Sequence, residues 1–207
     1  MITNNQNKKM KGRELIQFTG EQFCSDFSIE NPDKFNVYKN VYENFIRGLD
    51  IEAREKGVMI IGGKGTGKTL MMRVMHRIFK STERKFYWLK ARELKYMVDE
   101  MTLSEILVKF GSGLKVDLYI DDIALETGGQ KIYGNYVNVI SDLLYDRYEL
   151  FCSTGIRTHI SSNLPRTVDN NLYPDIMTIE KVCGERVSDR LIELCELHIM
   201  DGESLRK

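Results

Sequence analysis

The sequence predicts a three-layer α/β/α fold built on a central parallel sheet. Short apolar runs alternate with helical segments along most of the 207 residues, and this alternation is typical of parallel strands covered by helices on both faces. Hydrophobic residues make up 42% of the chain, which is enough to bury one sizeable core. We therefore expect one core at residues 34–207, preceded by an N-terminal arm or small docking element at residues 1–33.

The expected strands and helices follow from the spacing of apolar residues. Strands are expected at residues 58–61, 86–89, 116–120, 158–162 and 197–200, and helices at residues 36–46, 69–79, 93–101, 136–148 and 185–195. In the first of these helices, Val37, Val41 and Phe45 recur every four residues and define one apolar face. Only seven residues follow Met200, so we expect no C-terminal lid domain after the core.

Composition limits the classes of function. No run approaches the roughly 18 to 20 apolar residues of a membrane helix, and the polar N-terminus does not resemble a secretory signal, so we expect a cytoplasmic protein without a membrane partner. The four cysteines and three histidines show no metal-ligand spacing. Thirty basic residues balance thirty acidic ones, so any binding of nucleic acid must depend on a local patch.

The strongest motif is a phosphate-binding loop between the strand at 58–61 and the helix at 69–79. It consists of Gly62, Gly63, Lys64, Gly65, Thr66, Gly67, Lys68 and Thr69, and fits the pattern of glycine, four residues, glycine, lysine and serine or threonine. Glycines let backbone N–H groups converge on phosphate oxygens, and the helix N-terminus adds positive potential there. We expect ATP in this loop, with Lys68 at the β and γ phosphates and Thr69 offering its hydroxyl to Mg²⁺.

Two carboxylates follow the strand at 116–120. Asp121 is placed to reach the Mg²⁺ shell, and Asp122 to polarise the attacking water. Taken alone, a strand followed by two aspartates is more often a solvent-exposed turn, but its position about fifty residues after the phosphate loop favours the catalytic interpretation. If Asp122 is not the catalytic acid, Glu126 is the next candidate.

Asn163 and Arg190 are two further candidates, each with a structural alternative. Asn163 ends the strand at 158–162, where ligands of open α/β sheets bind, but an asparagine there also caps turns. Arg186 and Arg190 project from one side of a helix, and an arginine offered to a neighbouring subunit would stabilise charge on the phosphates. From spacing alone, an intrahelical pair of Arg190 with Glu193 is the favoured interpretation.

These motifs, in this order, resemble the AAA+ ATPases of the bacterial DnaC/DnaI-type helicase-loader family, and the related IstB-type transposition ATPases share the pattern. The resemblance covers about residues 35–207 and includes the stretch Gly184-Glu185-Arg186-Val187-Ser188-Asp189-Arg190. It implies a P-loop NTPase fold of the AAA+ type, with Asn163 as the sensor asparagine and Arg190 as the arginine finger acting in trans within a homo-oligomer. It also implies a replicative helicase as partner and single-stranded DNA bound by the ATP form.

The sequence departs from this family in three places. Asp122 stands where many AAA+ proteins have glutamate, and His159 stands in the sensor strand where an apolar residue is usual. The N-terminal segment is also shorter than the helicase-binding domain of the loaders. For DNA contact, Lys131, Tyr133 and Tyr136 combine basic and aromatic character, although a solvated loop and helix cap would have the same composition.

The leading interpretation is an ATP-hydrolysing replication protein that loads a helicase with single-stranded DNA. An alternative is an IstB-like ATPase that assists a transposase on duplex DNA. A small P-loop kinase is a third, but we find no lid segment for it, and Asp121, Asp122 and Asn163 suit the positioning of a water. A fourth is a binding module in which ATP is only a structural ligand.

Overall fold

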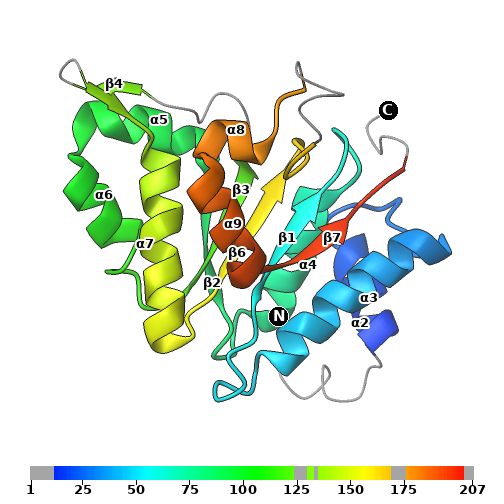
Figure 1. Cartoon of the computed structure of the whole chain (residues 1–207). Helices are drawn as coiled ribbons and strands as arrows, with labels where there is room; N and C mark the ends of the chain where they lie inside the picture. Colours follow the sequence, from blue (N-terminus) through cyan, green and yellow to red (C-terminus); the bar gives the residue numbers. More distant parts are fainter. Residues whose placement is uncertain (1–11, 124–129, 133–134, 169–175, 203–207) are drawn as a thin grey trace.

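Five parallel strands form the central sheet of the computed structural model, which describes residues 12–123, 130–132, 135–168 and 176–202. The strand order is β2-β3-β6-β1-β7, and every pairing is parallel (Figure 1). The strands are β1 (Gly57–Ile61), β2 (Phe86–Lys90), β3 (Asp117–Ile123), β6 (Thr158–Ser162) and β7 (Cys195–Ile199). All five lie at or within a few residues of the predicted positions.

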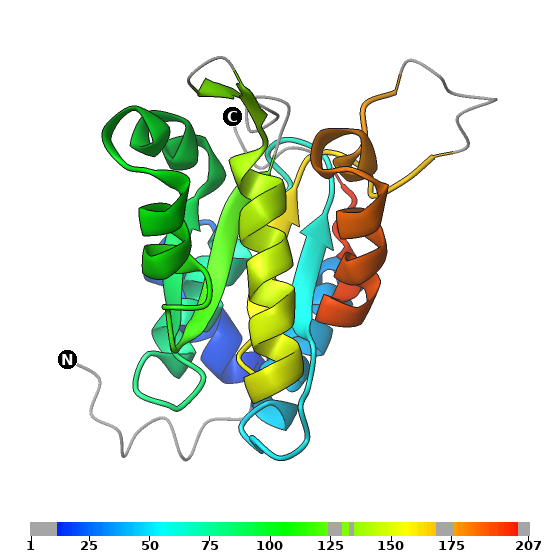
Figure 2. The same ribbon diagram turned by 60° about the vertical axis from the view of Figure 1, so that its left-hand side comes forward.

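Helices cover both faces of this sheet. One face carries α2 (Gly12–Glu21), α3 (Pro32–Arg47) and α4 (Lys68–Phe79). The other carries α5 (Ala91–Glu100), α6 (Leu103–Phe110), α7 (Val139–Thr154), α8 (Ile179–Cys183) and α9 (Glu185–Leu194). In Figure 2, α7 crosses in front of the sheet between the green helices α5 and α6 and the orange-red α9. The three-layer α/β/α fold predicted from the sequence is confirmed, and among the described residues no helix follows β7.

Capping residues explain where the predicted helix boundaries differ from the observed ones. Helix α3 begins at Pro32, before the predicted start at residue 36, because the Asn31 side chain accepts a hydrogen bond from the Lys34 N–H at 3.1 Å. Helix α7 begins only after Asn138, because residues 135–137 form β5 (Asn135–Val137), which pairs with β4 (Gln130–Ile132). These hairpin strands were not expected.

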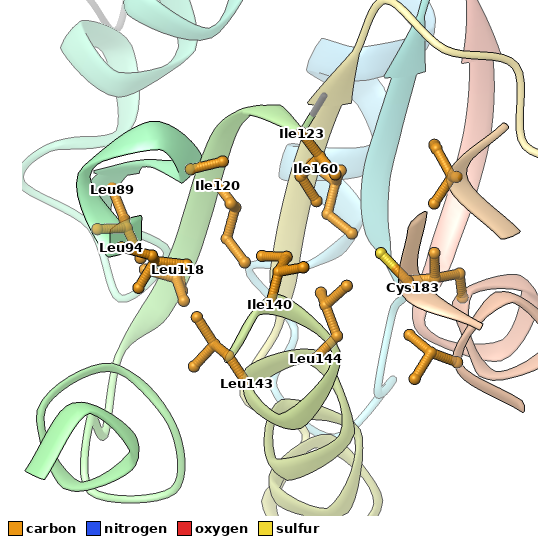
Figure 3. Packing of buried hydrophobic residues seen from close by; sticks show 14 of the residues in the cluster. Leu89, Leu94, Leu118, Ile120, Ile123, Ile140, Leu143, Leu144, Ile160 and Cys183 are labelled. Atoms are coloured by element: carbon orange, nitrogen blue, oxygen red, sulfur yellow. The ribbon is translucent and has the colours of Figure 1, made fainter. Parts of the chain in front are cut away.

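Two apolar clusters fix the helices on the sheet. Figure 3 shows the first, in which Ile120 and Ile160 of the central strands meet Ile140 and Leu144 of α7. On the opposite face, Met71 and Met75 of α4 belong to a second buried cluster. Burial of apolar area at about 25 cal/mol per Å² is the main force that holds these layers together. The consequence for function is that the carboxyl ends of β1, β3 and β6 lie at one rigid edge.

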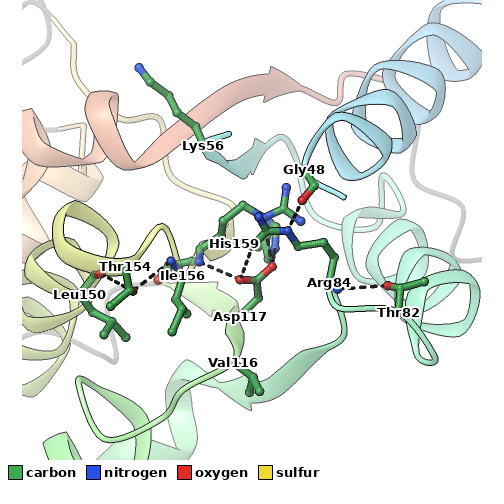
Figure 4. Close-up of polar contacts among 12 residues, drawn as sticks. Gly48, Lys56, Thr82, Arg84, Val116, Asp117, Leu150, Thr154, Ile156 and His159 are labelled. Atoms are coloured by element: carbon green, nitrogen blue, oxygen red, sulfur yellow. Dashed lines mark hydrogen bonds and ion pairs between the residues drawn. The ribbon is translucent and has the colours of Figure 1, made fainter. Parts of the chain in front are cut away.

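A buried ionic cluster lies at the opposite end of the sheet (Figure 4). Asp117 accepts a hydrogen bond from Arg157 Nε at 3.0 Å, and Arg84 Nη1 lies 3.6 Å from the same carboxylate. Burial raises the pKa of Asp117, but His159 and Arg157 outweigh it and hold the pKa at about 2. Removing one partner of such a cluster leaves a buried charge uncompensated, which costs about 3–5 kcal/mol.

His159, the unusual polar residue of the sensor strand, belongs to this cluster. Its ring is fully buried and stacks on Phe45 with 4.6 Å between the ring centroids. Its Nδ1 accepts a hydrogen bond from the Val58 N–H at 3.1 Å, and its Nε2 lies 3.8 Å from Asp117. Burial lowers the pKa of His159 to about 4, so the ring is neutral at pH 7.

The N-terminal segment packs on the core in its described part. Helix α2 lies against α4, and Ile16, Phe27 and Ile29 are buried in the same apolar cluster as the α4 residues. The division into an arm at residues 1–33 and a core at residues 34–207 stays a prediction. None of the helices described by the structure has the length and apolar content that crossing a membrane requires.

Candidate nucleotide site

The phosphate-binding loop connects β1 to α4, as predicted. Gly65 and Gly67 adopt positive φ angles of 83° and 105°, a backbone conformation that residues with a Cβ rarely adopt. Gly67 is the N-cap of α4, and no side chain caps this helix. The first amides of α4 therefore face the loop and can donate to an anion.

Lys68 is buried and held by three oxygen atoms. Its Nζ donates to the carbonyl oxygens of Gly62 and Gly63, both at 2.7 Å, and to Oδ1 of Asn163 at 2.6 Å. Asn163 follows β6, which is the strand beside β1. The strand order thus brings the predicted lysine and the predicted sensor amide into direct contact.

Thr69 and Asp121 also meet. The Thr69 hydroxyl donates to Asp121 Oδ1 at 3.1 Å. The same carboxylate oxygen accepts from the Tyr119 hydroxyl at 2.6 Å and from the Ser161 hydroxyl at 2.9 Å. Burial, and then the negative charge of Asp121, raise the pKa of Tyr119 well above its usual range, so this hydroxyl remains a donor. Asp121 is held in one orientation by three neighbours.

Asp122 has an unusual backbone conformation. Its φ angle is +61°, and the register between β3 and β6 shifts between Ile120 and Ile123. Aspartate and asparagine tolerate the left-handed region better than most residues. The irregularity leaves the Asp122 side chain exposed, where its Oδ1 accepts from Asn163 Nδ2 at 2.8 Å. Asn163 therefore bridges Lys68 and Asp122.

A cavity of about 510 Å³ opens over these residues. Its lining consists of Lys64, Gly65, Gly67, Lys68, Thr69, Leu70, Arg73, Asp122, Ser161 and Asn163. One cavity therefore brings together residues of the loop, Asp122 and Asn163, all of which were predicted from the sequence. The side of the cavity formed by the basic side chains and the loop amides suits phosphate, and the exposed carboxylate of Asp122 lies beside it.

Arg190 does not line this cavity. Its guanidinium carbon lies 4.4 Å from the ring centroid of Tyr145 and 5.3 Å from that of Tyr148, both on α7. Glu193, the alternative partner considered from the sequence, instead accepts a hydrogen bond from the Tyr148 hydroxyl at 2.6 Å. Arg190 is half-buried on a surface formed by α7 and α9, apart from the phosphate loop of its own chain.

Several predicted residues fall where the structure gives no side-chain description. Glu126 and Tyr133 lie outside the described residues, and the side chains of Lys131 and Tyr136 do as well. Their proposed roles stay predictions. Conversely, sequence reasoning missed Tyr119, Ser161 and Arg73. Tyr119 was detectable in principle, because alternate residues of a strand share a face and Tyr119 is two residues before Asp121.

The strand order β2-β3-β6-β1-β7, the loop between β1 and α4, and the acidic end of β3 define a P-loop NTPase fold of the AAA+ type. Comparison with solved structures agrees with this fold assignment. DnaI covers 98% of this chain and 100% of its own, with a TM-score of 0.63 and 18% sequence identity. The DnaC helicase loader covers 84% of this chain and 93% of its own, with a TM-score of 0.56 and 18% identity.

AMPPCP-bound DnaA from Aquifex aeolicus is also similar, with a TM-score of 0.54 and 14% identity over 85% of this chain and 49% of that one. Neither a protein-family model nor a curated protein matches the sequence. At these identities the similarity concerns the fold, and the chain has the fold of the DnaC/DnaI-type AAA+ ATPases, as the sequence predicts.

Proposed function

We propose that this protein binds and hydrolyses ATP with Mg²⁺, and acts as a replicative helicase loader on single-stranded DNA in the cytoplasm. One observation carries the proposal: Lys68, Asp122 and Asn163 line one cavity beside the contact between Thr69 and Asp121. These are the side-chain types that phosphate binding, metal coordination and water positioning require. They come from three parts of the chain that only the fold brings together.

Phosphate binding would use the loop backbone and Lys68. The uncapped amides of α4 supply donors, and the Lys68 ammonium supplies a charge that can leave its carbonyl partners for phosphate oxygens. Lys64 and Arg73 also line the cavity and add positive potential. The triphosphate of ATP matches this surface, because it is negatively charged and accepts hydrogen bonds.

Thr69 and Asp121 fit an Mg²⁺ ion. Both offer oxygen atoms, and these atoms lie 3.1 Å apart. Among the described residues, no three His, Cys, Asp or Glu side chains gather into a metal-binding group. That agrees with an ion held by one or two protein oxygens together with phosphates and waters, which is how Mg²⁺ is usually bound. When bound, Mg²⁺ neutralises part of the charge on the phosphates.

Hydrolysis would depend on Asp122. Its carboxylate is exposed at the cavity and oriented by Asn163, so it can accept a proton from a water placed between it and the phosphates. Asn163 also contacts Lys68, so one amide orients the carboxylate and contacts the phosphate-binding lysine. A second copy of the chain would supply Arg190 to complete the charge stabilisation.

The helicase partner is carried over from the similarity to the DnaC helicase loader. A pull-down of the wild-type protein from its own cell extract with ATP tests it, with Lys68→Ala protein as the matched bait that should not hold ATP. We expect the wild-type protein alone to recover a hexameric helicase. Recovery of a transposase would instead support target selection on duplex DNA, and equal recovery by both baits would contradict an ATP-dependent partner.

A further inference from the structure

A second hollow, of about 250 Å³, lies between α4 and the edge strand β2, next to the nucleotide cavity. It is lined by Phe23, Arg73, His76, Trp88, Lys90 and Asp121. We call it the α4–β2 groove. It lies on the face of the sheet that carries α2, α3 and α4, and Arg73 lines both this groove and the nucleotide cavity.

Aromatic rings form the floor of the α4–β2 groove. Trp88 makes edge contacts with Tyr119 at 4.6 Å and with His76 at 6.2 Å between ring centroids, so its indole is held in place. Phe23, from the turn after α2, is 44% exposed. Partial burial lowers the pKa of His76, which favours the neutral ring, so His76 contributes mainly ring surface. Fixed and accessible rings of this kind suit flat unsaturated groups such as nucleobases.

The rim of the α4–β2 groove is basic. Arg73 and Lys90 are exposed, and Arg77 lies one turn along α4 on the same side as Arg73. Helix α4 contains no acidic residue. The ion pair between Lys90 and Glu93, at 3.6 Å, is exposed and therefore weak. Asp121 is the carboxylate of the lining, and one of its oxygens is occupied by Thr69, Tyr119 and Ser161.

We propose that the α4–β2 groove binds single-stranded DNA, with bases stacked on Trp88 and phosphates at Arg73, Arg77 and Lys90. This rests on the proposed function and gives its DNA a location different from Lys131, Tyr133 and Tyr136. Single strands fit better than duplex, because the faces of paired and stacked bases are not available to a ring on the protein. A net charge of zero requires a local patch, and this groove combines cations with accessible rings.

The position of Arg73 also links the two sites. Since its side chain lines both the groove and the nucleotide cavity, ATP phosphates and DNA phosphates both act on it. Asp121 lines the groove and contacts Thr69 of the phosphate loop. The structure thus provides a direct route by which bound nucleotide changes the affinity for DNA.

Trp88 is the only tryptophan in the sequence, so its fluorescence reports on the groove alone. Wild-type protein with saturating ATP would be titrated with a labelled oligothymidylate, and both tryptophan emission and anisotropy of the label would be followed. We expect emission to be quenched in parallel with binding. Trp88→Leu should weaken binding by about tenfold, which corresponds to the loss of one stacked base.

The charges are tested with the double variant Arg77→Ala/Lys90→Ala. We expect about tenfold weaker binding and a salt dependence reduced by about 1.4 in logarithmic slope, since two phosphate contacts are lost. Lys39→Ala/Lys109→Ala is the control, because it removes two exposed lysines from α3 and α6 outside the groove. All variants should bind a fluorescent ATP analogue like wild type, which shows that they are folded.

The outcomes separate the two proposals. If wild-type protein binds the oligonucleotide while Trp88 emission stays constant and the groove variants bind normally, the groove is not the site, although the proposed function stands. If wild-type protein binds no single-stranded DNA with ATP, or prefers duplex, both the groove proposal and the single-stranded DNA of the proposed function are wrong.

Discussion

At the scale of single residues, the contacts of Lys68 give the clearest support for the proposed phosphate site. It is buried, and its ammonium donates to two backbone carbonyls and to the side-chain oxygen of Asn163. These contacts hold the ammonium beside the loop, where it can reach a phosphate group. This is the arrangement expected of a residue whose role is to bind an anion.

We predict that Lys68→Ala lowers ATP affinity by about a hundredfold or more, because a charge-assisted contact to buried phosphates is lost. Titration with a fluorescent ATP analogue measures the effect. Lys80→Ala, an exposed lysine just after α4, is the control and should bind normally. Unchanged affinity in Lys68→Ala protein would show that ATP binds elsewhere.

Asp122→Asn should keep ATP binding but reduce turnover by roughly a hundredfold or more, because an amide cannot accept the proton of the attacking water. Asparagine is the suitable replacement, since it tolerates the φ of +61° and retains an oxygen for the bond from Asn163. Steady-state phosphate release and nucleotide affinity would be measured on the same sample. Turnover at the wild-type rate would move the catalytic role to another acid, of which Glu126 is the first candidate.

Most residues in and beside the nucleotide cavity were predictable from sequence, but not all of their supports were. Lys68, Thr69, Asp121 and Asp122 belong to local patterns whose spacing carries their chemistry. Tyr119 precedes Asp121 by two residues on β3, whereas Ser161 reaches Asp121 only because β3 pairs with β6, which no local pattern specifies. Arg73 lies on the exposed side of a helix, where an arginine is ordinary.

At the scale of elements, the contacts of strand β6 explain why this predicted sensor strand is polar. Its residue His159 replaces an apolar side chain, but the ring is buried against Phe45 and accepts a hydrogen bond from β1 through Val58. Its proximity to Asp117 links β6 to β3 at the end of the sheet opposite the nucleotide cavity. Polar residues here connect the strands, while apolar contacts hold the helices.

This cluster makes stability depend on pH in a defined window. His159 has a pKa of about 4 when folded and an ordinary value of 6.5, so between these values the unfolded chain binds more protons. Its contribution to stability is therefore complete above pH 6.5 and is lost as pH falls toward 4, by at most about 3 kcal/mol. The carboxyl of Asp117, with a pKa of about 2, titrates at lower pH.

We predict that His159→Gln removes this dependence, because glutamine offers an acceptor to the Val58 N–H but does not titrate. Urea unfolding at pH 7, 5.5 and 4 would be compared for the two proteins. Wild-type protein should lose up to about 3 kcal/mol more than the variant over this range. His76 and His198 are present in both proteins, so the difference isolates His159. Equal losses would show that folding does not lower the pKa of His159.

Elements with strong apolar periodicity were predictable, and those set by capping or pairing were not. The five strands and helix α4 were predicted within a few residues. Helix α6 was missed, although Thr102 and Glu105 form a capping box that signals its start. The hairpin of β4 and β5 has only three residues in each strand, too few for a periodic pattern.

At the scale of the whole molecule, the predicted site residues lie on two separate surfaces of the chain. Lys68, Thr69, Asp121, Asp122 and Asn163 gather at one edge of the sheet, whereas Arg190 lies on the α7–α9 surface against Tyr145 and Tyr148. Its guanidinium lies over two rings, which help to hold it in place. A second copy of the chain could place its own nucleotide cavity against this surface, and that is the central claim of the account.

Mixing two inactive variants tests this claim most directly. Arg190→Ala protein should bind ATP but hydrolyse it poorly, because the guanidinium acts mainly in the transition state. Lys68→Ala protein should not bind ATP but still offers an intact Arg190. Phosphate release would be measured for each variant and for mixtures, at concentrations where subunits associate and with single-stranded DNA present. We predict that activity reappears in the mixtures. If association is confirmed and no mixing ratio restores phosphate release, Arg190 does not act on a neighbouring subunit.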